Sequence, residues 1–368
     1  MSVFKLKIID RLFFAELAKM MASVVLVLSI ILLSQRLLGY LSKVSAGQLS
    51  SDAVLSLIGL QMILLLIKIL PPALLVSILL VLGRMYRDNE MSALFSAGIG
   101  LSRVYRAIFL FVGPLCALAL YLSLVIGPWA MQQVVQVKAG DQSSLDIRGI
   151  SQGRFNEYSR GDLVFYVEKI TDDEQMVNVF IQSVQHGKLG IISSSKGEIR
   201  VDPETGDRFI VLNNGKRYEG VPGQADYKVT EFEEYGVLVA EKTEVKIKLD
   251  VEDLPTSGLW DLGTTEAMSE LQKRLSIPLA LITFTVLAVP ISRVSPRAGM
   301  YGNLLTGLLV YIVYENFMSL SYSWMMKGVL LPWIGVWWVH VLMILLGLAL
   351  IVRSVGVRFV KKQWLGLS

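Results

Sequence analysis

Cysteine and histidine are scarce in this 368-residue chain, which has one cysteine and two histidines. Cys116 has no second thiol in the chain to pair with, which argues against a disulfide scaffold. His186 and His340, without cysteine partners, offer too few ligands for a zinc or iron site. The sequence is therefore not typical of a disulfide-stabilised protein or of a His/Cys metalloenzyme.

The motifs of ATP hydrolysis and of zinc peptidases are also missing. No G-x-x-x-x-G-K-[ST] phosphate loop occurs, and the nearest segment, Gly215-Lys216-Arg217, lacks the upstream glycine and the Ser or Thr that would hold magnesium. No H-E-x-x-H pattern occurs, and with two histidines a Ser-His-Asp triad has few ways to form. We therefore expect a chain that is not an enzyme, holds no cofactor and does not itself hydrolyse ATP.

Long apolar runs dominate instead. Hydrophobic residues make up 53% of the chain, and the mean hydropathy is +0.55. A helix needs about 20 apolar residues to cross the hydrocarbon of a bilayer. Six runs are candidates for membrane-spanning helices: Leu12–Leu33, Val54–Leu82, Ala107–Pro128, Leu275–Ile291, Met300–Leu320 and Leu330–Val352.

Lysine and arginine are distributed unevenly between the two ends of these runs. Thirteen fall at the termini and connections on one side, whereas the short connections on the other hold only Arg36, Lys43 and Lys327. Basic connections stay on the cytoplasmic side. We expect both termini to be cytoplasmic and the polar middle of the chain to lie across the membrane from them.

That middle, Met131–Arg274, carries 25 acidic and 17 basic residues and has the pattern of strands. β-rich or alternating runs occur at Leu163–Val167, Val177–Val184, Phe209–Leu212 and Val245–Leu249, and turn signals at Asp202–Gly206 and Asn213–Gly215. About 140 residues of short strands favour a β-sandwich or jelly roll, which protects its edges by closing two sheets.

The sequence thus predicts a six-helix membrane protein with an all-β, jelly-roll-like domain inserted between the third and fourth helices. The expected boundaries are 1–130 for helices one to three, with a cytoplasmic helix at about 84–97, then 131–274 for the β-domain and 275–368 for helices four to six.

The cytoplasmic connection, residues 83–98, has two interpretations. Its mixture of charges with Met85, Met91 and Phe95 favours a short amphipathic helix that Gly98 ends. Such a helix either presents an acidic group to a separate motor protein or lies on the membrane with Arg84 and Arg87 against lipid phosphates.

Two charges interrupt the apolar runs. Lys68 lies 14 residues from Leu82 and Glu315 lies 15 from Met300, which places both at roughly 21 to 23 Å from the cytoplasmic ends. Either they form an ion pair or share a water-filled cavity, or each reaches separately toward the membrane surface. Pro71-Pro72 in the same run as Lys68 predicts a kink or a break.

Several motifs, in order along the chain, resemble the LptF/LptG family of lipopolysaccharide export permeases, and LptF more than LptG. They are Leu82–Met91, Gly153–Glu157 with Val164–Glu168, Arg217–Gly220, Tyr227–Phe232 and Arg274–Pro278 continuing to Gly299. The resemblance spans essentially the whole chain.

The resemblance implies a permease subunit of an ABC-type exporter in the Gram-negative inner membrane. Such a subunit extracts lipopolysaccharide and passes it to a periplasmic bridge, in outer-membrane biogenesis. The implied partners are an LptG-like permease, an LptB-like ATPase dimer that uses ATP and Mg, an LptC-like single-helix protein and an LptA-like bridge, with no nucleic acid. The β-domain is then a periplasmic jelly roll.

The resemblance also assigns roles to residues. The cytoplasmic helix becomes a coupling helix in which Glu90 docks into the ATPase, with Tyr86, Arg87, Asp88 and Met91 around it, so the docking interpretation is favoured. Arg36, otherwise an ordinary interfacial anchor, meets lipopolysaccharide phosphates. A second basic position of the family is Gly39 here, and Lys43 is the nearest substitute.

Two other functions fit the same sequence pattern. One is a permease for another lipid or a lipoprotein. The other is a scaffold that couples an ATPase to a periplasmic partner without transport.

Overall fold

The computed structural model describes residues 8–45, 49–148, 152–158, 163–171, 175–185, 188–201, 208–220, 228–240, 250–293 and 301–355. The chain divides into two compact units. The first, here called the helical unit, comprises Met1–Gln35, Gly59–Val134 and Leu249–Ser368. The second, here called the sheet unit, comprises Arg36–Ile58 and Val135–Lys248.

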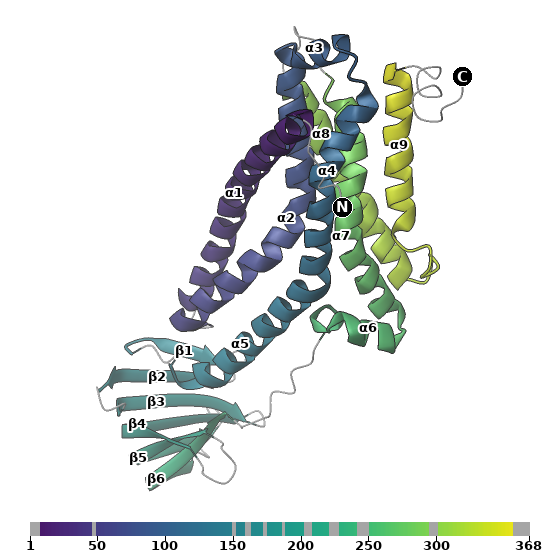
Figure 1. Ribbon diagram of the computed structural model, residues 1–368. Coiled ribbons are helices and arrows are strands. Elements are labelled where there is room, and N and C mark those ends of the chain that lie inside the picture. The colour runs from purple at the N-terminus through teal and green to yellow at the C-terminus, as the bar shows by residue number, and fades with distance from the viewer. Residues whose placement is uncertain are drawn as a thin grey trace, which may run out of the picture. The chain divides into compact units, whose positions relative to one another are not determined.

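Helices account for most of the chain (Figure 1). Their bounds are α1 Ile8–Ser45, α2 Ser51–Arg87, α3 Glu90–Ser96, α4 Leu101–Tyr121, α5 Gly127–Arg148, α6 Thr256–Leu262, α7 Thr265–Ile291, α8 Tyr301–Met326 and α9 Trp337–Val355. A π-helical turn, η1 (Leu122–Ile126), joins α4 to α5, and a 3₁₀ turn, η3 (Val251–Asp253), precedes α6.

The predicted apolar runs all lie in helices, except that the last begins later. In the described part of the chain, five helical stretches are long and apolar enough to cross a membrane, and α9 is a shorter apolar helix. Leu330–Val336, predicted to begin the last span, precedes α9 as turns. Six membrane spans therefore remain a prediction.

The prediction that the whole middle of the chain is β is wrong at both ends. Helix α5 continues through Arg148, and α6 and α7 already occupy Thr256–Leu262 and Thr265–Ile291. Polar residues extend a helix readily once an apolar segment has nucleated it, because each added residue contributes one hydrogen bond without a new nucleus. The strand-like composition of the middle did not reveal these helices at its two ends.

A break of α2 at Pro71-Pro72 is also contradicted, because the helix is continuous from Ser51 to Arg87 with both prolines inside it. Figure 1 shows that α2 changes direction along its length. A proline removes one hydrogen bond and bends a helix, but in a long apolar helix the neighbouring turns maintain it.

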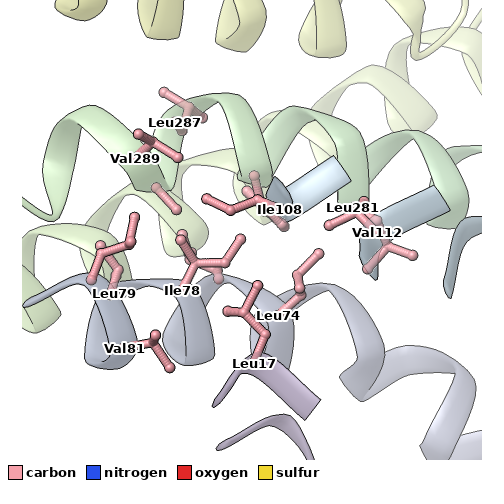
Figure 2. Packing of buried hydrophobic residues seen from close by; sticks show 14 of the residues in the cluster. Leu17, Leu74, Ile78, Leu79, Val81, Ile108, Val112, Leu281, Leu287 and Val289 are labelled. Carbon is pink, nitrogen blue, oxygen red and sulfur yellow. The ribbon is translucent and has the colours of Figure 1, made fainter. Parts of the chain in front are cut away.

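The core of the helical unit joins residues from helices far apart in the sequence. Figure 2 shows Leu17 of α1 and Leu74 and Ile78 of α2 packed with Ile108 of α4 and Leu281 of α7. Each of these five side chains is fully buried. Helix α7 is central, since it contacts α4, α6, α8 and α9. By contrast, α1 and α8 leave many large apolar side chains exposed, as expected of helices that face lipid or another protein.

Hydrogen bonds join the π-helical turn to the segment that enters α7. The Ser123 hydroxyl donates to the Arg274 carbonyl oxygen at 2.7 Å, and the Thr256 hydroxyl donates to the Leu124 carbonyl oxygen at 2.6 Å. A π-helical turn leaves some backbone carbonyls without helical partners. Here two hydroxyl-to-carbonyl bonds tie the α4–α5 junction to α6 and α7.

The strands of the sheet unit form one antiparallel sheet in consecutive order β1 to β6. Their bounds are β1 Phe155–Tyr158, β2 Leu163–Ile170, β3 Met176–Gln185, β4 Lys188–Val201, β5 Arg208–Gly220 and β6 Lys228–Ala240. Alternate residues such as Phe165 and Val167, Val179 and Ile181, and Ile210 are buried in one cluster. The runs predicted at Leu163–Val167, Val177–Val184 and Phe209–Leu212 are confirmed as strands.

A closed jelly roll is not what the described strands form. Each strand pairs with the next along the chain, and β4 and β5 pair over their full length, from Leu189 with Gly220 to Val201 with Arg208. A jelly roll requires strands that cross between two sheets, and long hairpins of this kind keep every strand in one sheet. The predicted strand Val245–Leu249 and the turn Asp202–Gly206 lie outside the described residues.

The predicted turn at Asn213–Gly215 lies instead in the middle of β5. Asn214 has a positive φ of 54°, so the residue type did indicate left-handed backbone. The strand nevertheless continues, because Gly215 lets it pass close to its neighbours. A Cβ at Gly215 would lie 2.5 Å from the Ser193 carbonyl oxygen and 2.5 Å from Cζ of Phe232.

We expect Gly215→Ala to destabilise the sheet unit by about 1–3 kcal/mol, because the methyl group overpacks a site closed by backbone. Thermal unfolding of the full chain, with protease sensitivity of the sheet unit, measures the effect. Gly236→Ala is the matched control, since its Cβ would come no nearer than 3.8 Å to Phe209. Equal unfolding temperatures for the two variants would contradict the packing argument.

Candidate functional site

The segment predicted as a single helix at about 84–97 is the last turn of α2 followed by the short helix α3. Helix α2 ends at Arg87, and α3 begins at Glu90 after Asn89, whose φ of 61° is left-handed and interrupts the helix. At the other end the Gly98 N–H donates to the Phe95 carbonyl oxygen and the Ile99 N–H to that of Leu94. This pair of hydrogen bonds is typical of a helix that ends at a glycine, and it confirms Gly98 as the end of the helix.

Buried side chains hold this connection, and its charged residues face outward. Met85 and Met91 are 2% and 0% exposed, whereas Arg87, Asp88 and Glu90 are exposed. The predicted docking residues are therefore of two kinds. Met91 positions the segment from inside, and the three charged residues form its surface.

Contacts with other helices fix the orientation of the segment. The Arg84 guanidinium donates to the Glu16 carboxylate of α1 at 2.9 Å. The Tyr86 ring lies 6.5 Å from that of Phe95 between ring centroids. Arg87 donates to Asp88 at 3.0 Å. Glu90 stands in the first turn of α3, where a negative charge is favourable to the helix.

Arg36 and Lys43 lie on the last turns of α1, in the sheet unit, and both are exposed. Seven residues are nearly two helical turns, so both belong to one face of the helix. A side chain at Gly39, between them, would meet nothing within 4 Å. The space beside Gly39 is therefore open.

Lys68 and Glu315, the two charges that interrupt the apolar runs, lie on one cavity. Lys68 of α2 and Glu315 of α8 line one cavity of about 470 Å³, together with Pro71. Such a volume falls within the range of about 300–1,000 Å³ usual for small-molecule pockets. The structure thus shows a shared cavity for Lys68 and Glu315, while no salt bridge joins them in the described part of the chain.

A second pair of charges lies on the wall of this cavity. The Lys273 ammonium lies 2.9 Å from the Glu252 carboxylate and 3.3 Å from that of Glu270, and 5.9 Å from the centroid of the Tyr322 ring. The hydrogen bond from Lys273 lowers the pKa of the Glu252 carboxyl below its ordinary value, so Glu252 stays ionised at neutral pH.

Arg274 was not predicted as an important residue. Its side chain is 6% exposed and bonds the Glu270 carboxylate at 3.0 Å. It also donates to the Thr256 hydroxyl at 3.1 Å and to the carbonyl oxygens of Glu252 and Leu254 at 3.1 and 3.0 Å. The sequence signals were the Glu270–Arg274 spacing, which is common on exposed helices, and the place of Arg274 at the start of the Arg274–Pro278 motif.

Metal ligation finds no support in the described residues, where no three His, Cys, Asp or Glu side chains are grouped to hold an ion. His340 is buried in α9, with Nδ1 at 3.4 Å from the Thr283 hydroxyl. His186 lies outside the described residues.

Comparisons with known proteins place the whole chain in one family. The family model described as "Lipopolysaccharide export system permease LptF/LptG" matches residues 11–353. The lipopolysaccharide export system permease protein LptF of Escherichia coli K12 is 24% identical over 346 residues, which cover 93% of this chain and 94% of that protein. The protein of the same name from Shigella flexneri matches equally. The chain therefore belongs to the LptF/LptG family of lipopolysaccharide export permeases.

Proposed function

We propose that this chain is one permease subunit of an exporter that removes lipopolysaccharide from the inner membrane and passes it to a periplasmic bridge. A second, LptG-like permease completes the membrane channel, and an LptB-like ATPase dimer supplies energy from ATP and Mg. LptC-like and LptA-like proteins are the proposed next carriers. The family membership supports the cargo, and the exposed charged surface of the α2–α4 connection supports coupling to a motor.

The energy source must come from outside the chain on physical grounds. Each methylene of an acyl chain that leaves the bilayer costs about 0.8 kcal/mol if it meets water. Extraction therefore needs both apolar shelter and an input of work. The exposed apolar faces of α1 and α8 fit a lipid path or a partner helix, and the rigidly anchored Arg87–Glu90 surface fits a point where work enters.

Reconstitution tests this function directly. The chain, its permease partner and the ATPase are placed in liposomes that contain lipopolysaccharide, and ATP-dependent transfer to a soluble periplasmic acceptor is followed by crosslinking. We expect transfer only with all subunits and ATP. Movement of another lipid or a lipoprotein instead supports the alternative permease, and ATP-dependent assembly without any transfer supports the scaffold.

We further propose six membrane spans with both termini cytoplasmic and the sheet unit periplasmic, with Arg36 and Lys43 near lipopolysaccharide headgroups. In a Cys116→Ser background, Ser92→Cys in α3 and Ser195→Cys in β4 replace exposed serines. A membrane-impermeant maleimide, given to cells with a permeabilised outer membrane, is expected to label only the Ser195→Cys protein. After lysis the maleimide should also label the Ser92→Cys protein. Labelling of Ser92→Cys but not Ser195→Cys in unlysed cells would overturn the topology.

A further inference from the structure

The cavity between α2, α7 and α8 contains charges of both signs that differ in how they are satisfied. Lys273 and Glu252 neutralise each other at 2.9 Å. Lys68 and Glu315 line the same space, but no salt bridge of 4.0 Å or less is formed between them among the described residues. Both side chains are exposed.

The surroundings of Glu315 make the cavity amphipathic. The hydroxyl of Tyr311, one turn earlier on α8, lies beside the Glu315 carboxyl. Ile277, Ala280 and Met318 supply apolar wall. An ionised group at membrane depth is unfavourable without a counter-charge. A lysine and a carboxylate that share a cavity without contact therefore present an unfilled space with a positive and a negative end.

From this arrangement we propose that the cavity binds the headgroup of a zwitterionic amphiphile, with a phosphate ester against Lys68 and a primary ammonium against Glu315. The apolar wall then accepts the first carbons of the ligand. An anion alone would be repelled by Glu315, and a cation alone by Lys68, so a ligand that carries both charges is favoured over either. The inference uses the membrane location assumed in the proposed function, but it does not require lipopolysaccharide as cargo.

Native mass spectrometry of the full chain in detergent tests the preference on the unaltered protein. Phosphatidylethanolamine and the anionic phosphatidylglycerol are titrated separately. We expect phosphatidylethanolamine to bind about tenfold tighter or more, as one additional charge-assisted contact provides. Equal affinities of the unaltered protein for the two lipids, or tighter binding of phosphatidylglycerol, would overturn the proposal.

Variants identify the two ends of the site. Lys68→Gln and Glu315→Gln are each expected to weaken phosphatidylethanolamine binding about tenfold or more. Glu315→Gln should also raise the relative affinity for phosphatidylglycerol, because it removes a carboxylate that repels an anion from the cavity. Lys19→Gln, a lysine of α1 whose side chain is 77% exposed, is the matched control and should bind as the parent does. Unchanged binding in Glu315→Gln would disprove an ammonium end, whether or not Lys68→Gln has an effect.

The source of the headgroup is resolved by competition. Glycerophosphoethanolamine, the water-soluble headgroup, competes with phosphatidylethanolamine. Weak competition indicates that the ligand is the bilayer lipid, and full competition indicates a soluble zwitterion. Either result supports a zwitterionic ligand. Loss of phosphatidylethanolamine preference with intact lipopolysaccharide transfer would remove this inference alone, whereas absent transfer with the preference intact would remove the proposed function alone.

Discussion

Arg274→Met is expected to destabilise the helical unit by about 3–5 kcal/mol, since it removes one partner of a buried ion pair. The Glu270 side chain is 9% exposed and would lose its 3.0 Å bond to the guanidinium. The carbonyl oxygens of Glu252 and Leu254 would lose their donors as well. The apparent unfolding temperature of the full chain in detergent, followed by circular dichroism, measures the effect.

Arg200→Met provides a matched comparison for that change. Arg200 also bonds two carboxylates, Glu198 at 2.5 Å and Glu234 at 2.7 Å, but its side chain is 54% exposed. Water replaces such bonds with little loss, so the unfolding temperature should not move measurably. Similar losses in Arg274→Met and Arg200→Met would show that burial does not decide the outcome.

Glu90→Ala is expected to leave the fold intact and to weaken association with the proposed ATPase partner about 10- to 100-fold, the range for one charge-assisted hydrogen bond. Glu90 is exposed and has no buried contact to lose, and Met91 next to it keeps the segment in place at 0% exposure. Biolayer interferometry against the ATPase gives the affinity, and ATP-driven lipopolysaccharide transfer gives the functional consequence.

The control for Glu90 must remove the same charge elsewhere. Asp261 is an exposed carboxylate of α6, and Asp261→Ala should keep both association and transfer. If Glu90→Ala behaves like Asp261→Ala, then the α2–α4 connection does not couple through this carboxylate, and its exposed charges serve solubility or the membrane surface.

Membrane depth and residue type predicted some features of the site well. Counting turns from the ends of two apolar runs placed Lys68 and Glu315 at one level, and the structure has them in one cavity. Helical rise is nearly constant, so the count needed no knowledge of packing. The stop at Gly98 was also predictable, because glycine is the residue that most readily adopts its φ of 81°.

Other features depend on tertiary contacts that local patterns do not contain. Asn214 and Gly215 are residue types typical of turns. Strand β5 nevertheless pairs with β4 both before and after Asn214, so it continues as one strand. Arg274 resembles an exposed residue in sequence, and three segments that meet around it make it a buried centre. Asn89 interrupts the predicted helix, and Met85 before it and Met91 after it are both buried.

The bonds of the π-helical turn have a mechanical consequence. The chain leaves the helical unit through α5 and returns to it ahead of α6, and these two tethers are joined by Thr256, Ser123 and the backbone of Arg274. Tension on either tether is therefore delivered to one point on α7. Lys273, the residue before Arg274 on α7, lines the cavity, so both crossings between the units are bonded to the helix that forms the cavity wall.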